Sequence, residues 1–95
     1  MFVVTLTFSE NKAKAPEFMK GHNAWIQEGF DRGLFLMVGS LQPNMGGAII
    51  AHETSRETLQ AFVATDPFVA EGIVSATILE ITPSRLDDRL GFLAA

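Results

Sequence analysis

The chain has 95 residues, of which 47% are hydrophobic and 19% are charged, and it carries a formal net charge of -4 with no cysteine. A chain of this length has room for one hydrophobic core, so we expect a single domain over residues 1–95. The lack of cysteine excludes disulfides, thiol nucleophiles and Cys-ligated metals. The acidic balance, without a cluster of Lys or Arg, argues against nucleic acid as a partner.

The N-terminal residues 1–8 lack the positive charge and the cleavage pattern of an export signal. No apolar run approaches the roughly 20 residues needed to cross a bilayer. We therefore expect a cytoplasmic protein without a membrane partner. The hydrophobic fraction is high for so short a chain, which predicts that some apolar surface meets another chain.

The first half of the sequence predicts a strand followed by a helix. Residues 2–8 alternate in the manner of a strand, with the even-numbered residues on its apolar face. Pro16 suits the first turn of a helix that runs to about residue 31 or 32, where Gly33 forms the C-terminal cap. The apolar side of this helix consists of Phe18, His22, Trp25, Ile26, Gly29 and Phe30.

A hairpin is expected next. Residues 34–41 are apolar on both of their alternating faces, which predicts a strand buried on both sides. The Pro, Asn and Gly content of residues 42–46 indicates a turn, and residues 47–53 are expected to form the third strand.

The second half predicts another helix and a final strand. Thr54 and Glu57 have the spacing of a capping box at a helix start. This helix ends before Asp66, because the ring of Pro67 disfavours a helical conformation in the residue before it. A fourth strand is expected over residues 74–82.

The element order β-α-β-β-α-β predicts an α+β protein with a ferredoxin-like sandwich. Two helices can cover only one face of the sheet, yet several strands carry apolar residues on both faces. We therefore expect a homodimer through the uncovered sheet face, which would complete a dimeric α+β barrel. The core is expected over residues 1–83. The tail, residues 84–95, is too apolar for a free end and is expected to lie along its own sheet or to clasp the partner.

Several stretches of the sequence resemble the YCII-related (YciI-like) family, and the resemblance extends to about residue 83. The matching stretches are Phe2-Val3-Val4-Thr5, Lys20-Gly21-His22, residues 33–40 and, most specifically, the segment from Thr65 to Ile73 with its Asp-Pro-aromatic sequence. The resemblance implies a small dimeric α+β barrel protein with a ferredoxin-like subunit. Relatives in that family include a dehydrochlorinase of chlorinated hydroxyquinones, and muconolactone isomerases share the barrel fold.

The resemblance also implies an active site that contains His22 and Asp66, beside the strand segment Gly39-Ser40. The chain differs from the family pattern in two places. Family members often have a basic residue three positions before the His, where this chain has Met19, and the turn of residues 42–46 is shorter than usual. Both differences concern contacts that a substrate would make.

The residues themselves leave two interpretations of this pair. His22 on an apolar stripe is either a core imidazole with a satisfied N–H or an acid/base group, since imidazole takes and returns a proton near neutral pH. Asp66 is a favoured helix N-cap before Pro67, and it could also orient His22. The two tasks are compatible because a carboxylate has two oxygens.

Four further residues are expected to bind substrate. Gly39 allows a close approach of a ligand or of another backbone, and Ser40 is either a polar strand end or a hydroxyl for the ligand. Trp25 belongs either to the core or to a wall beside a planar substrate, and Phe68 follows the Asp-Pro corner. The remaining histidine, His52, is expected at the surface, and no metal site is expected because its ligand spacings are missing.

The leading hypothesis is therefore a cofactor-free lyase or isomerase that acts on a small polar or cyclic organic molecule. A non-catalytic dimer that binds a metabolite or serves as an accessory subunit is the first alternative, with the pair as a buried polar lock. A cofactor-independent monooxygenase is the second alternative. Catalysis predicts a cavity beside both residues, whereas a lock predicts that packing seals the pair.

Overall fold

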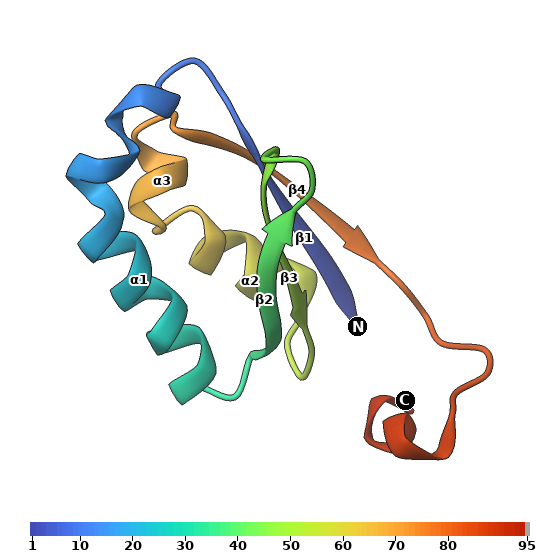
Figure 1. Ribbon diagram of the computed structural model, residues 1–95. Helices are drawn as coiled ribbons and strands as arrows, with labels where there is room; N and C mark the ends of the chain where they lie inside the picture. The colour runs from blue at the N-terminus through green and yellow to red at the C-terminus, as the bar shows by residue number, and fades with distance from the viewer. Residues whose placement is uncertain (95) are drawn as a thin grey trace.

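The computed structural model describes residues 1–94, which form a four-stranded antiparallel sheet with helices against one face (Figure 1). The strands follow the order β2-β3-β1-β4 across the sheet. Their bounds are Phe2–Phe8 for β1, Phe35–Leu41 for β2, Gly46–Ala51 for β3 and Val74–Glu80 for β4. The helices are α1 (Ala15–Asp31), α2 (Arg56–Val63) and the single turn α3 (Pro67–Ala70), with 3₁₀ segments η1 (Lys12–Lys14) and η2 (Asp88–Leu93). The predicted α+β class and ferredoxin-like order are confirmed.

The hydrophobic core lies between the sheet and the helices. The even-numbered residues of β1 point into it, and Val4 is fully buried. Leu59 on α2 and Ile73, just before β4, are fully buried as well. The residues of β1 alternate as the sequence predicts, because one face of this central strand packs into the core.

Helix α1 packs closely against β2 at Gly29. A Cβ atom at this position would lie 2.2 Å from Cε2 of Phe35 on β2. The missing side chain of Gly29 thus makes room for the Phe35 ring, which is 4% exposed. This contact fixes the distance between α1 and β2.

The expected alternation of strand two is wrong near its start. A register shift lies between Phe35 and Met37, since Phe35 pairs with Ala51 and Met37 pairs with Ile50. The extra residue of this β-bulge moves the later side chains by one face. As a result Phe35 and Val38 both point to the helices, while Met37 is 49% exposed.

The ends of three elements also differ from the expectation. Ser55, not Thr54, caps α2, because its extended backbone places Oγ 3.1 Å from the amide nitrogen of Thr58. Strand β3 ends at Ala51, ahead of Glu53, whose φ of +53° is incompatible with an extended strand. Strand β4 ends at Glu80.

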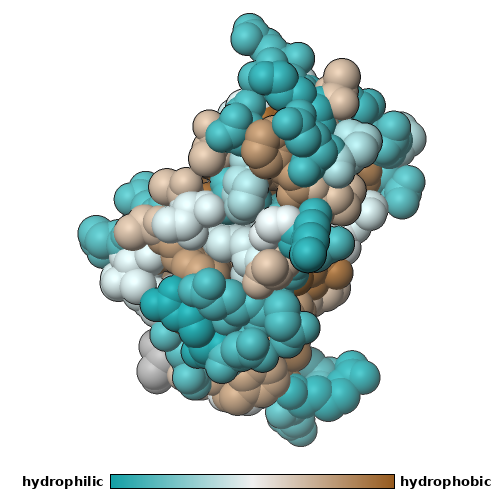
Figure 2. Space-filling view, turned by 90° about the vertical axis from the view of Figure 1, so that its left-hand side faces the viewer, coloured by the Kyte–Doolittle hydropathy of each residue, from teal (hydrophilic) through white to brown (hydrophobic). Residues whose placement is uncertain are grey.

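One face of the sheet carries no helix. Four apolar residues form a row across it, because the strand registers pair Met37 with Ile50, Ile50 with Val3, and Val3 with Leu79. Leu79 is 52% exposed. In contrast, the opposite side of the molecule, where α1 lies, presents hydrophilic residues over much of its area, with hydrophobic areas between them (Figure 2).

The tail leaves the sheet after β4 and ends in η2 (Figure 1). It does not run along the sheet of its own chain; the ring of Phe92 instead meets His52 edge-on, with ring centroids 5.8 Å apart. Asp87 caps η2, and the side-chain hydrogen bond from Arg89, followed by its backbone N–H, lowers the pKa of Asp87. Among residues 1–94, none of the helices is long and apolar enough to cross a membrane.

Candidate active site

The corner between α2 and α3 places Asp66 in the interior. Pro67 occupies the first turn of α3, and Asp66 before it has an extended backbone with φ -60° and ψ 124°. Its Oδ1 accepts a hydrogen bond from the amide of Phe68 at 3.0 Å. Asp66 is therefore the N-cap that the sequence predicts, and it is fully buried.

His22 contacts the same carboxylate from α1. Its Nδ1 lies 2.8 Å from Oδ1 of Asp66, and the His22 side chain is 13% exposed. Because the carboxylate oxygen accepts, we assign the ring hydrogen to Nδ1, which leaves Nε2 as the basic nitrogen.

Both hydrogen bonds of the carboxylate converge on one oxygen. Oδ1 accepts from His22 and from the Phe68 amide, whereas the buried Oδ2 has no partner within residues 1–94. The expectation that capping and orienting use separate oxygens is therefore wrong. The backbone of the corner aims a single oxygen at both donors.

The aromatic ring of Phe68 holds the face of the imidazole. The two rings are nearly parallel, at an interplanar angle of 2° with centroids 3.9 Å apart. Asp66 and Phe68 are two residues apart at the start of α3, so this one turn fixes the edge and the face of the His22 ring together. On α1 itself, the Trp25 ring lies 6.0 Å from His22 at 22°.

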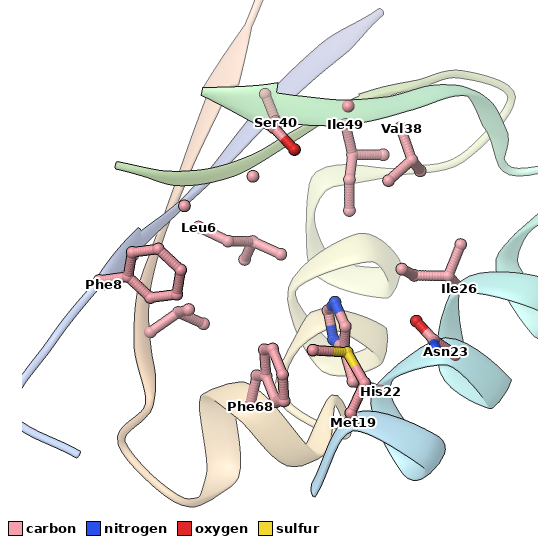
Figure 3. A pocket seen from close by; sticks show the side chains of 15 residues that line it. Leu6, Phe8, Met19, His22, Asn23, Ile26, Val38, Ser40, Ile49 and Phe68 are labelled. Carbon is pink, nitrogen blue, oxygen red and sulfur yellow. The ribbon is translucent and has the colours of Figure 1, made fainter. Parts of the chain in front are cut away.

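A cavity of about 350 Å³ opens beside His22, between α1, α3 and the sheet (Figure 3). Its walls are mainly apolar, and the larger apolar side chains that line it are Leu6, Phe8, Met19, Ile26, Val38, Ile49, Phe68 and Val74. Asp66 does not line this cavity; it lies behind His22. The cavity therefore reaches the pair from the imidazole side only.

Three polar side chains line the cavity, and they come from opposite walls. His22 and Asn23 project from α1, while the hydroxyl of Ser40 points into the cavity from β2 (Figure 3). Gly47 pairs with both Ser40 and Leu6 across the sheet, so it lies on the same face and leaves space beside them.

The structure brings together most, but not all, of the predicted residues. His22, Gly39, Ser40 and Phe68 line the cavity. Trp25 does not: it is 5% exposed in the core, and its Nε1 donates to the carbonyl of Phe62 at 3.0 Å.

Asn23 is a cavity residue that the sequence analysis did not single out. The sequence feature that could have indicated it is its position next to His22. Neighbouring side chains on a helix are about 100° apart, so a wide cavity can reach both.

The second histidine, His52, follows the other end of β3 and belongs to a separate region near the tail. In the part of the chain that the structure describes, no three His, Cys, Asp or Glu side chains gather in a way that could hold a metal ion.

Comparisons with known proteins agree with this fold. A family model described as the YCII-related domain matches residues 1–82. Among solved structures, the chain is similar to 5-chloro-2-hydroxyhydroquinone dehydrochlorinase from Burkholderia phenoliruptrix AC1100, determined in complex with 2,5-dihydroxybenzoquinone. The two share 14% sequence identity with a TM-score of 0.68, over 85% of this chain and 93% of the other. No match was found among curated proteins. The match to the family over most of its length shows that this chain belongs to the YCII-related domain family.

Proposed function

We propose that this protein is a cofactor-free lyase or isomerase of small cyclic organic molecules, with His22 as general acid/base and Asp66 as the residue that orients it. One observation carries the proposal: the 2.8 Å bond from Nδ1 to Asp66 leaves Nε2 as the free nitrogen of a ring that lines an apolar cavity. A base with a fixed tautomer beside a substrate-sized cavity is the arrangement that proton abstraction needs.

The proposed step begins when Nε2 accepts a proton from a C–H or O–H group of the substrate. The Asp66 carboxylate stabilises the imidazolium that results and does not itself take the proton. In an elimination, the released electron pair forms a double bond as the leaving group departs with its own bonding pair. In an isomerisation, Nε2 returns the proton to a different carbon and the double bond shifts. A positioned general base of this kind contributes about 10²–10⁴-fold in rate.

The surroundings of His22 support this chemistry. Apolar walls reduce the access of water to the reacting atoms, and Phe68 keeps the imidazole from rotating out of position. Ser40 on the opposite wall offers a hydroxyl that can hold a substrate oxygen. The activity named for the structurally similar protein, a dehydrochlorination, is an elimination, which favours the elimination branch of the proposal.

The complete burial of Asp66 favours a second candidate function. In that alternative the protein binds a small metabolite without turnover, and the His22–Asp66 pair serves as a polar lock between α1 and α3. The cavity reaches His22 while packing seals Asp66, so each candidate meets part of its expected geometry, and turnover is the property that separates the two.

The test assays the purified protein against chlorinated hydroxyhydroquinones, hydroxyquinones and lactones, following chloride release and product formation by chromatography. We expect turnover of at least one compound, and a fall in kcat/KM of at least about 100-fold in His22→Gln. His52→Gln is the matched control, because it makes the same change away from the cavity, and we expect it to retain activity.

Equal activity in His22→Gln and the wild type would refute the proposed role of His22. If compounds shift the NMR signals of cavity residues but none is converted, the second candidate is the better account.

A further inference from the structure

We propose that the cavity selects uncharged single-ring molecules, and that Met19 at its mouth is the residue that sets this selection against carboxylates. The inference rests on the proposed function only in taking this cavity as the substrate site. It adds the charge class of the substrate and names a specificity-determining residue.

The composition of the cavity wall is the first argument. Fifteen residues line it, and His22, Asn23 and Ser40 are the polar ones; the others are apolar residues and glycines. A carboxylate moved from water into such surroundings loses its hydration and finds no Lys or Arg among the lining residues, which is costly. The Asp66 carboxylate behind His22 and the net charge of -4 add repulsion.

The size and polarity of the cavity give the shape of the ligand. A volume of about 350 Å³ is at the small end of the roughly 300–1,000 Å³ found for ligand pockets, so one ring fits better than two. Polar groups lie on opposite walls, with His22 and Asn23 on α1 and Ser40 on β2. A ring with hydroxyl or carbonyl groups at opposite edges can reach both walls.

Met19 lies where a cation would be needed to bind an anion. It precedes His22 by three residues, so the two side chains project from the same side of α1, and both line the cavity (Figure 3). The Met19 side chain is 42% exposed, which places it at the mouth. Lys12 places its ammonium over the ring of the wall residue Phe8, 4.5 Å from the ring centroid, and Lys12 is not itself among the lining residues.

The test uses two probes that differ by one group: hydroquinone, and 2,5-dihydroxybenzoate, which adds a carboxylate that is ionised at pH 7. Their dissociation constants are measured by NMR titration of the wild-type protein and of Met19→Arg. Arginine is chosen because its guanidinium binds a carboxylate through two hydrogen bonds. The control is Gln27→Arg, which adds the same charge to the same helix at an exposed position outside the cavity.

We expect the wild type to bind hydroquinone at least about tenfold more tightly than 2,5-dihydroxybenzoate. Met19→Arg should reduce or reverse this preference, and Gln27→Arg should leave it nearly unchanged. The inference is overturned if the wild type binds the carboxylate equally well or better, if it binds neither probe, or if both variants shift the preference alike.

Binding and turnover separate this inference from the proposed function. Selective binding of the neutral probe without any catalysed reaction would support the charge selection and count against the catalytic role of His22. Conversely, His22-dependent turnover of a carboxylate-bearing substrate would support catalysis and overturn the charge selection.

Discussion

At the scale of single residues, the site depends on one oxygen atom. Oδ1 of Asp66 accepts hydrogen bonds from the His22 ring and from the Phe68 amide, while Oδ2 remains buried without a partner in the described chain. Burying a carboxylate oxygen without a hydrogen-bond partner is unfavourable, so Asp66 lowers the free energy of unfolding through its Oδ2. This cost is explained if the negative charge is needed when His22 accepts a proton.

Two substitutions of Asp66 separate the contribution of its shape from that of its charge. Asp66→Ala removes the N-cap, worth about 1 kcal/mol, and leaves the His22 N–H unpaired at about 1–3 kcal/mol. We therefore expect a loss of about 2–4 kcal/mol in the free energy of unfolding, measured by urea denaturation. Asp66→Asn keeps an acceptor oxygen, so it should lose only about 1–2 kcal/mol.

Turnover should fall in both variants, because both lack the carboxylate that stabilises the imidazolium. If Asp66→Ala were as stable as the wild type, the two hydrogen bonds to Oδ1 would contribute nothing to the fold, and the corner would be held by packing alone.

The positions of some site residues can be predicted from the sequence and those of others cannot, for physical reasons. Asp66 is predictable because a proline follows it, and His22 because it interrupts an apolar helical stripe. The cavity contacts of Asn23 and the burial of Trp25 away from the cavity depend on how far α1 is rotated over the sheet. That rotation is a tertiary property with no local signal in the sequence.

At the scale of the elements, the contact between Gly29 of α1 and Phe35 of β2 limits how close the helix lies to the sheet. Alanine favours a helix over glycine by about 1 kcal/mol, yet at residue 29 its Cβ would lie 2.2 Å from the Phe35 ring. Overpacking of a core typically costs about 1–3 kcal/mol. We therefore expect Gly29→Ala to be destabilising by thermal and urea unfolding, against its helix propensity.

The control for this prediction is the double variant Gly29→Ala/Phe35→Leu. A smaller side chain at residue 35 gives the new methyl group room, so the cost of Gly29→Ala should shrink by about 1 kcal/mol or more in that background. An unchanged cost would show that the Phe35 ring does not limit the approach of α1.

Among the strands too, local patterns are predictable from the sequence, whereas features that depend on pairing with another strand are not. The alternation of β1 indicates its buried face because a regular strand has a period of two residues. In β2 the register shift between Phe35 and Met37 breaks that period. The shift belongs to the pairing with β3, which joins residues far apart in the sequence, such as Phe35 and Ala51.

At the scale of the whole molecule, the sheet has one covered and one uncovered face. The row formed by Val3, Met37, Ile50 and Leu79 lies on the uncovered face. We propose that two copies of the chain bury this row against each other in a two-fold dimer. The order of the elements can be predicted from the sequence. The second copy of the chain as the partner of this face stays a prediction.

A pair of methionines provides a matched test of the dimer. Met37 belongs to the row and is 49% exposed, while Met45, in the turn between β2 and β3, is 50% exposed. Met37→Lys would place a charge in the proposed interface, whereas Met45→Lys adds the same charge outside it. By sedimentation equilibrium we expect a dimer for the wild type and for Met45→Lys, and dissociation towards monomer for Met37→Lys. A wild-type monomer, or equal effects of both substitutions, would contradict this interface.

The stacking of Trp25 near His22 has a spectroscopic consequence. Trp25 is the single tryptophan of a chain without tyrosine, it is buried, and its ring lies 6.0 Å from the imidazole. Because the imidazole lies against the indole, the emission of the unlabelled protein should differ between the wild type and His22→Gln, whereas His52→Gln should leave it unchanged. Equal spectra for His22→Gln and the wild type would contradict this contact. The fold thus places its one indole fluorophore beside the residue on which its proposed chemistry depends.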